Sequence, residues 1–391
     1  DIVKSTRNKP EGYLSHLQRE EILNLIQPVL GQMEFRPLLA ALDFFKFSRK
    51  SVDVQTQTNF AESWAQAAAT AIDSPQTRPA DVLSAVPTIA TLPTSMPLTF
   101  IDKVLAFLLP EKTNAFILAG VLKMMVRSGY PITLEKVDGI LHYIGQKVFL
   151  NIKGEPPAGR DLLQGVESAI IALFPARMSS GSLLGVIKIF ALTRAEPTPE
   201  KMEQISSQIA DVLRASRDTI FINKMILALN FWGGTVRFPK FLMGVIQTVF
   251  MSNTDPKVQR IRDVNRFLNL LEKQDYHLFP DTGAIVLQAL IHRMTSFQQE
   301  FAKDPNYLID PAEMTALRYS LWEINKQKLS VTPEFMKAWE NIQFFALDHI
   351  NQRIAGNIES EISRLRVIEA PDSVGTPRIS TPPPSFGTPP E

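Results

Sequence analysis

Cysteine is absent from the 391 residues of this chain, and histidine occurs only five times. Without cysteine the chain has no disulfide framework, no cysteine-ligated zinc or iron–sulfur site and no thiol nucleophile. It also lacks an apolar run of the roughly 20 residues that a membrane-spanning helix needs. The best candidate, residues 116–126, contains Lys123 and is followed by Arg127. We therefore expect a protein that does not span a membrane.

Motifs for nucleotide or metal chemistry are missing as well. The chain has no GxxxxGKS or GxxxxGKT loop, and no GxGxxG follows a predicted strand. The nearest histidines, His277 and His292, are typical of a loop residue and a helix-surface residue rather than of a ligand pair. Residues 181–185 resemble a nucleophile elbow only loosely, and Ser182 is more typical of a helix cap. The sequence therefore predicts no catalytic residue, no metal and no cofactor.

The charge and the composition of the chain further restrict the class of protein to which it can belong. The 41 basic and 40 acidic residues leave a net charge of +1, so the chain as a whole has no attraction to nucleic acid or to anionic membranes. An apolar fraction of 45% excludes a wholly disordered chain. The length suits two or three globular domains or one long array of repeats.

A repeated phrase favours the array. The same unit recurs from about residue 35 to residue 355. It consists of an apolar helix, a short turn with a basic or polar residue, a proline and a second, amphipathic helix. Proline is tolerated in the first turn of a helix, which explains its place before the second helix. The spacings are 34, 68, 40, 41 and 53 residues; we expect an extra helix over residues 161–173 and an insertion over residues 297–312 in the two long gaps. A drifting period of about 34 to 41 residues is typical of stacked helical hairpins. The turn prolines are Pro97, Pro131, Pro199, Pro239, Pro280 and Pro333.

We therefore expect an all-α fold. Residues 13–368 form an α-solenoid of about seven to eight helical hairpins, residues 1–12 an N-terminal arm, and residues 369–391 a disordered tail rich in Pro, Ser and Thr. The first helix is expected over residues 18–30. Its predicted apolar face consists of Ile22, Leu25, Ile26, Val29 and Leu30.

Basic residues supply the main functional signal. Residues 177–240 contain nine basic and five acidic side chains, and residues 257–273 contain five and two. A solenoid places equivalent positions of successive hairpins in rows, so a modest excess becomes a stripe that neutralises phosphates. The equally weighted alternative is that these basic residues lie on ordinary solvated helix faces and bind no phosphate. Aromatic residues near the turns could stack on unpaired bases, but we favour a place in the core for them. They are Tyr130, Trp232, Phe238 and Tyr276. The candidate RNA-binding residues are Lys188, Arg194, Arg217, Lys224, Arg237, Lys240, Arg260, Arg262 and Arg266.

The repeated phrase resembles the helical repeats of organellar RNA-metabolism proteins, namely the FASTK-type, RAP-associated and octotricopeptide-like arrays. It is also similar to helical-repeat subunits of kinetoplastid mitochondrial RNA-editing and mitoribosome-assembly complexes. The residues that carry the resemblance are 122–131, 187–197, 229–239, 268–280 and 321–333. No RAP segment follows the array, which puts RNA cleavage in doubt. The periods also drift, unlike those of tetratricopeptide and pentatricopeptide repeats.

The resemblance implies a non-catalytic subunit of a ribonucleoprotein complex in the mitochondrial matrix, acting in RNA editing, processing or stability. Its expected partners are single-stranded RNA and other protein subunits. The alternative is a protein-binding scaffold of armadillo or HEAT type, in the mitoribosome or its assembly for example, without direct RNA contact.

Overall fold

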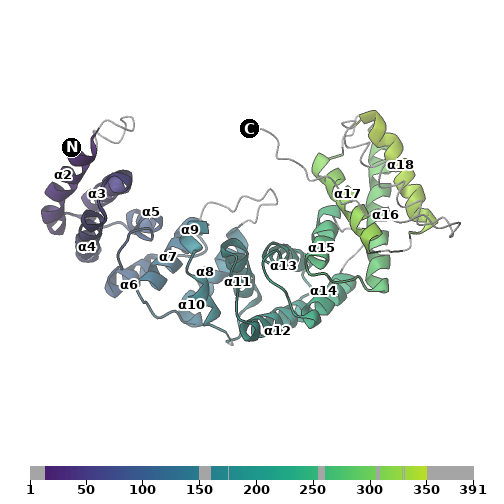
Figure 1. Ribbon diagram of the computed structural model, residues 1–391, viewed down its shortest axis with the longest axis horizontal. Coiled ribbons are helices and arrows are strands. Elements are labelled where there is room, and N and C mark those ends of the chain that lie inside the picture. Colours follow the sequence, from purple (N-terminus) through teal and green to yellow (C-terminus); the bar gives the residue numbers. More distant parts are fainter. Residues whose placement is uncertain are drawn as a thin grey trace. The chain divides into compact units, whose positions relative to one another are not determined.

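The computed structural model describes residues 14–148, 160–174, 176–253, 260–304, 309–327, 329 and 331–349, with side chains to residue 342. All regular secondary structure in this part of the chain is helical, which confirms the all-α prediction (Figure 1). The predicted arm and tail, residues 1–12 and 369–391, lie outside the described residues. No helix among the described residues is both long enough and apolar enough to cross a membrane.

The helices follow one another with short connections, as expected for hairpins. In chain order they are α2 His16–Ile26, η1 Gln27–Gln32, α3 Phe35–Ser48, η2 Arg49–Ser51, α4 Val54–Ala71, α5 Pro79–Ile89, α6 Leu98–Phe107, α7 Ala115–Arg127, α8 Leu134–Lys147, α9 Arg160–Leu163, α10 Glu167–Ile171, α11 Ser180–Thr193, α12 Pro199–Ala215, α13 Thr219–Trp232, α14 Lys240–Asn253, α15 Ile261–Lys273, α16 Pro280–Lys303, α17 Pro311–Lys326 and α18 Pro333–His349.

The chain divides into two compact units, where the sequence predicts one continuous repeat domain. Unit 1 takes the described residues of 1–254 and 266–277, and unit 2 takes those of 255–265 and 278–391. Helix α15 supplies residues to both units. Unit 2 is built mainly on the packing of α16 against α18.

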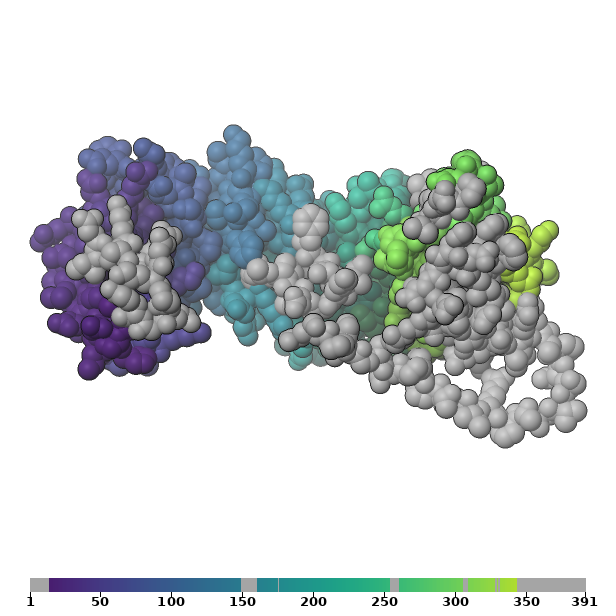
Figure 2. All heavy atoms as spheres, turned by 90° about the horizontal axis from the view of Figure 1, so that it is seen from above, coloured from purple at the N-terminus to yellow at the C-terminus, as the bar shows by residue number. Residues whose placement is uncertain are grey.

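In unit 1 the helices pack in the order of the chain. Helix α5 contacts α7, α7 contacts α8, α8 contacts α11, α11 contacts α13, and α12 contacts α14. Figure 2 shows the same order as consecutive colours from purple to teal along this unit. The apolar faces of these helices are therefore buried between helices that lie close together in the sequence.

Prolines begin helices where the sequence predicts them. Pro199, Pro280 and Pro333 are the first residues of α12, α16 and α18, and Pro97 is the N-cap of α6. A first-turn N–H has no partner within its own helix, so proline removes nothing there. An acidic residue follows each of the three helix-initial prolines, in α12, α16 and α18, and lies in the first turn near the positive end of the helix dipole.

Two predictions about helices were wrong in detail. Leu25 and Val29 of the predicted apolar face are exposed, whereas Leu30 is buried as predicted. Leu23, outside the predicted face, is buried as well. The chain changes from α-helix to a 3-10 turn at Gln27, so Val29 no longer follows the helical period of α2. The extra helix over residues 161–173 is two short helices, α9 and α10. Gly165 separates them with a φ of 85°, which a continuous helix does not allow.

The expected insertion also takes a different form. Residues 297–303 do not form a separate segment, because α16 continues without a break to residue 303, and residues 311–312 begin α17. Helix α16 therefore has 24 residues. Part of the expected insertion thus extends an existing helix.

A close approach of α8 to α11 holds the middle of unit 1. Gly145 of α8 faces Gly181 and Gly185 of α11. A Cβ atom on Gly185 would lie 1.9 Å from the carbonyl oxygen of Leu141, so the two backbones touch without side chains between them. Beside this contact, the hydroxyl of Ser182 donates to a carboxylate oxygen of Asp138 at 2.6 Å.

Candidate nucleic-acid interface

The nine predicted RNA-binding residues have three kinds of environment. Lys188 is buried, with 6% of its surface exposed, and Arg262 and Arg266 are partly buried. The exposed residues are Arg194, Arg217, Lys224, Arg237, Lys240 and Arg260.

The assignment of Lys188 to an RNA surface was wrong. Its ammonium group donates to the carbonyl oxygens of Gly145 and Val148, both at 2.5 Å, at the C-terminal end of α8. The pKa of Lys188 is lowered to about 8, chiefly because the buried charged form loses its hydration and also because the charge of Lys224 lies nearby. Lys188 therefore joins α11 to α8 and does not reach solvent.

Other cations also bind main-chain carbonyls, in the connections between helices and near helix ends. Lys147 donates to the carbonyls of Pro110 and Thr113, at 3.1 and 2.6 Å. Lys273 donates to the carbonyl of Asn230 at 2.9 Å. The last carbonyls of a helix have no partner in the helix and lie at the negative end of its dipole. Some of the basic residues near the turns thus have a structural role, which the sequence pattern does not separate from RNA binding.

The second predicted basic segment is divided. Arg260 and Arg262 belong to unit 2, and Arg266 belongs to unit 1. Arg262 pairs with the carboxylate of Asp310, so its charge is already compensated. The three arginines are therefore not a single site.

Trp232 brings two of the remaining cation-bearing turns together in unit 1. Its indole N–H donates to the carbonyl of Ala195 at 2.8 Å, and its ring lies 5.3 Å from the ring of Phe238. Arg194 precedes Ala195, and Arg237 precedes Phe238. We name the surface formed by Arg194, Arg237 and Lys240 the turn edge. Trp232 is fully buried, and Tyr130 and Phe238 are almost fully buried. Their burial confirms that these three residues belong to the core.

Arg217 and Lys224 lie elsewhere on unit 1. Arg217 comes just before α13, whereas the turn edge follows the end of this helix. A helix of 14 residues is about 21 Å long. Arg217 and the turn edge therefore lie at opposite ends of α13, and the predicted stripe is interrupted.

Three turns of unit 1 share one backbone conformation. Gly129, Arg194 and Asp275 have φ values of 63°, 57° and 53°, in the left-handed region, just after α7, α11 and α15. The next amide in each turn bonds back five residues, as in Ala195 to Phe190, which defines a Schellman cap. Glycine adopts this conformation without strain, whereas any other residue in it lowers the stability of the fold by about 1 kcal/mol. Arg194 is thus strained, exposed and without a side-chain partner among the described residues.

The residues that gave a weak catalytic signal form a structural contact. Ser182 is fully buried and is bonded to Asp138, while His142 of α8 bonds to Gln146 at 2.8 Å. Ser182 does not cap α11 either, because Ser179 is its N-cap. The spacing of Gly181 and Gly185, four residues apart, was the usable signal: small residues at this spacing allow two helices to approach closely. Among the described residues no group of three His, Asp or Glu side chains is placed to hold a metal ion.

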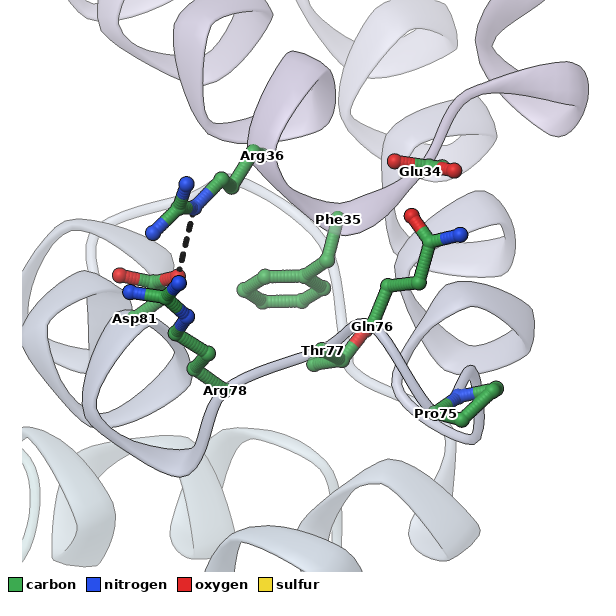
Figure 3. Close-up of a pocket in the computed structure, with 8 residues that line it drawn as sticks. All are labelled: Glu34, Phe35, Arg36, Pro75, Gln76, Thr77, Arg78 and Asp81. Carbon is green, nitrogen blue, oxygen red and sulfur yellow. Dashed lines mark hydrogen bonds and ion pairs between the residues drawn. The ribbon is translucent and has the colours of Figure 1, made fainter.

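Unit 1 also has a pocket of about 380 Å³ between the start of α3 and the start of α5 (Figure 3). Arg36 pairs with Asp81 across it at 2.9 Å. Glu34 faces the amide of Gln76, which donates to both carboxylate oxygens when its nitrogen is turned toward them. The charges on this pocket are largely compensated, so it is a poor candidate for binding phosphate.

Comparison of the chain with protein-family models, curated proteins and solved structures finds no match.

Proposed function

We propose that this chain is a non-catalytic scaffold that binds single-stranded RNA along the turn edge of unit 1. We further propose that its hairpins form an α-solenoid and that other faces bind protein subunits of a ribonucleoprotein complex. Packing in chain order supports the solenoid. So do the side-chain hydrogen bonds between neighbouring repeats, which span 32 residues for Gln208 to Ala176 and 43 for Lys188 to Gly145. The placement in the mitochondrial matrix and in RNA editing or processing rests on the family resemblance alone.

The strained Arg194 carries the RNA proposal. A glycine at this position would satisfy the helix cap without strain, as Gly129 does in the equivalent turn. Strained backbone conformations concentrate at functional sites. The guanidinium of Arg194 is exposed and has no internal partner among the described residues, so it serves no visible structural purpose.

Phosphate binding is the chemistry that the turn edge supports. Arg194 and Lys240 present exposed cations, and Arg237 keeps donors free beyond the one that it gives to the carbonyl of Lys273. Each phosphate neutralised on a single strand contributes about 0.7 to the slope of log affinity against log salt. The turn edge is thus expected to bind RNA without sequence preference and with a slope of about 2. Trp232 and Phe238, which lie in these turns, are buried, so we do not expect them to stack on bases.

The test is a triple variant, Arg194→Gln with Arg237→Gln and Lys240→Gln. We expect its affinity for a fluorescent oligouridine to fall about tenfold at low salt, and the slope to fall by about 2. The matched control replaces three exposed cations at the opposite helix ends, Lys112, Arg177 and Arg214, by Gln. Binding that falls equally in both variants would contradict a defined site, and a wild-type chain that binds no RNA would refute the proposal.

A protein-binding scaffold without RNA contact is the second candidate. Large apolar side chains are exposed in the first turns of several helices, with Ile220 67% and Phe241 42% exposed. Such residues are typical of contacts with protein partners. Stable association with other proteins, together with no RNA binding by the wild-type chain, would favour this alternative.

A further inference from the structure

A second group of cations meets in unit 1, outside the segments that the sequence singles out. It surrounds the connection between α5 and α6, residues 91–97. Arg49 donates to the carbonyl of Thr91 at 3.1 Å, and the hydroxyl of Ser95 donates to the carbonyl of Arg127 at 3.0 Å. The amide of Met96 donates to the hydroxyl of Ser128 at 2.8 Å. The connection is therefore held between Arg49 and the last turn of α7.

The guanidinium of Arg127 is the unusual member of this group. Its Nη1 atom is buried and has no hydrogen-bond partner, and the side chain has no ion pair among the described residues. Burial lowers its pKa, and the nearby charge of Arg49 lowers it further. A buried donor without a partner is costly, and a like charge beside it adds to the cost.

The local charge is unbalanced. Lys123 lies one helical turn before Arg127 on the same face of α7 and donates to the carbonyl of Gln164. Its pKa is lowered by burial and then by Arg127, and only Glu167 acts in the opposite direction. Three cations therefore face one carboxylate.

We propose that Arg49 and Arg127 form a binding site for one phosphate group of RNA. A guanidinium presents a planar set of donors that matches the oxygens of a phosphate, and a bound anion would offset the repulsion between the two cations. Arg127 ends α7 two residues before the left-handed Gly129, in the turn equivalent to the one that contains Arg194. RNA that follows the turns of unit 1 would thus meet both sites. The choice of RNA as the source of the phosphate rests on the proposed function.

The experiment compares the double variant Arg49→Met, Arg127→Met with a matched control, Lys46→Met, Lys50→Met. The control removes the same charge from exposed positions next to Arg49. We measure binding of a fluorescent 30-nucleotide oligouridine to the full chain at several salt concentrations. The double variant should bind about tenfold more weakly at low salt with a slope lower by about 0.7, while the control should change less than about twofold.

A second readout separates binding from a structural role. Removing an unpaired buried cation should raise the melting temperature of the RNA-free Arg127→Met variant by about 1 to 3 °C. Inorganic pyrophosphate should raise the melting temperature of the wild-type chain but not that of the double variant. A variant that melts lower than the wild type, and that pyrophosphate still stabilises equally, would overturn the proposal.

The failures of the two proposals are distinguishable. If the turn-edge variant loses RNA binding while the double variant keeps the wild-type affinity and slope, the phosphate site is refuted and the proposed function stands. If the wild-type chain binds no RNA while a phosphothreonine peptide binds and needs Arg127, RNA is refuted as the source of the phosphate, and the proposed function fails with it.

Discussion

The contact between α8 and α11 predicts that one added methyl group will destabilise unit 1 strongly. In Gly185→Ala the new Cβ would lie 1.9 Å from the carbonyl oxygen of Leu141 and 2.8 Å from its carbon. Separations below 3.0 Å essentially never occur for a Cβ atom. Both neighbours are backbone atoms, so no side chain can rotate away, and the helices must separate by about 1.1 Å.

The cost of this separation follows from the packing of α11. Residues 182–190 of this helix are all buried, so moving it opens gaps along its length. A gap of about 0.5 to 1 Å loses a quarter to a half of the dispersion energy of each contact. We expect Gly185→Ala to lower the free energy of unfolding by about 3 to 5 kcal/mol, more than most overpacking substitutions.

Gly139 of α8 provides the control. It is exposed, and a Cβ there would meet only a side-chain atom of Pro110, at 3.7 Å. Gly139→Ala should stabilise the chain by about 0.5 to 1 kcal/mol, because alanine is the better helix former. Urea unfolding followed by circular dichroism and tryptophan fluorescence measures both variants. Equal effects of the two substitutions would refute the close approach of the helices.

Three further predictions concern the turns and the buried lysine. Thermal unfolding should show Arg194→Gly about 1 kcal/mol more stable than the wild type, and Gly129→Ala less stable by a similar amount, because only glycine adopts the left-handed cap without strain. Lys188 has a pKa of about 8 when folded and about 10.5 when unfolded, so between these values the unfolded chain holds a proton that the folded chain does not. Stability should therefore rise by up to about 3 kcal/mol from pH 8 to 10.5, a rise that urea titrations of Lys188→Met should lack. Gln274→Ala should lower the free energy of unfolding by about 2 to 4 kcal/mol in the same titration. The buried amide nitrogen of Gln274 donates to the carbonyls of Gly233 and Val236 at 2.8 and 3.0 Å, and its oxygen accepts from the amide of Phe238 at 2.8 Å.

The local elements were predictable because their causes are local. Pro199, Pro280 and Pro333 begin helices because proline lacks an amide hydrogen, whatever the rest of the chain does. The break at Gly165 was missed because glycine tolerates both helical and left-handed backbone, and only the neighbouring packing selects one of them. The exposed Leu25 was missed because the sequence pattern does not show which face of α2 packs against the rest of unit 1, and Leu23 is buried there instead.

The candidate site was only partly predictable. Arg194 and Arg237 were named from their sequence neighbourhood, and the structure joins their turns through Trp232. Lys188 was named by the same reasoning and is buried, because a lysine on an apolar helix looks the same whether it ends in solvent or at a carbonyl. Arg49 and Arg127 were not named, since both lie outside residues 177–240 and 257–273, the two segments in which the basic excess was counted.

By itself the sequence determined an all-α chain without cysteine chemistry, because helix periodicity, helix ends and composition depend on residues close together in the chain. Tertiary structure alone decided which cations are used inside the fold and which are left over. The reason is that Arg49 and Arg127, or Gly185 and Leu141, become neighbours only when helices pack, and burial then determines whether a charge or a missing side chain stabilises the fold or is free for a ligand.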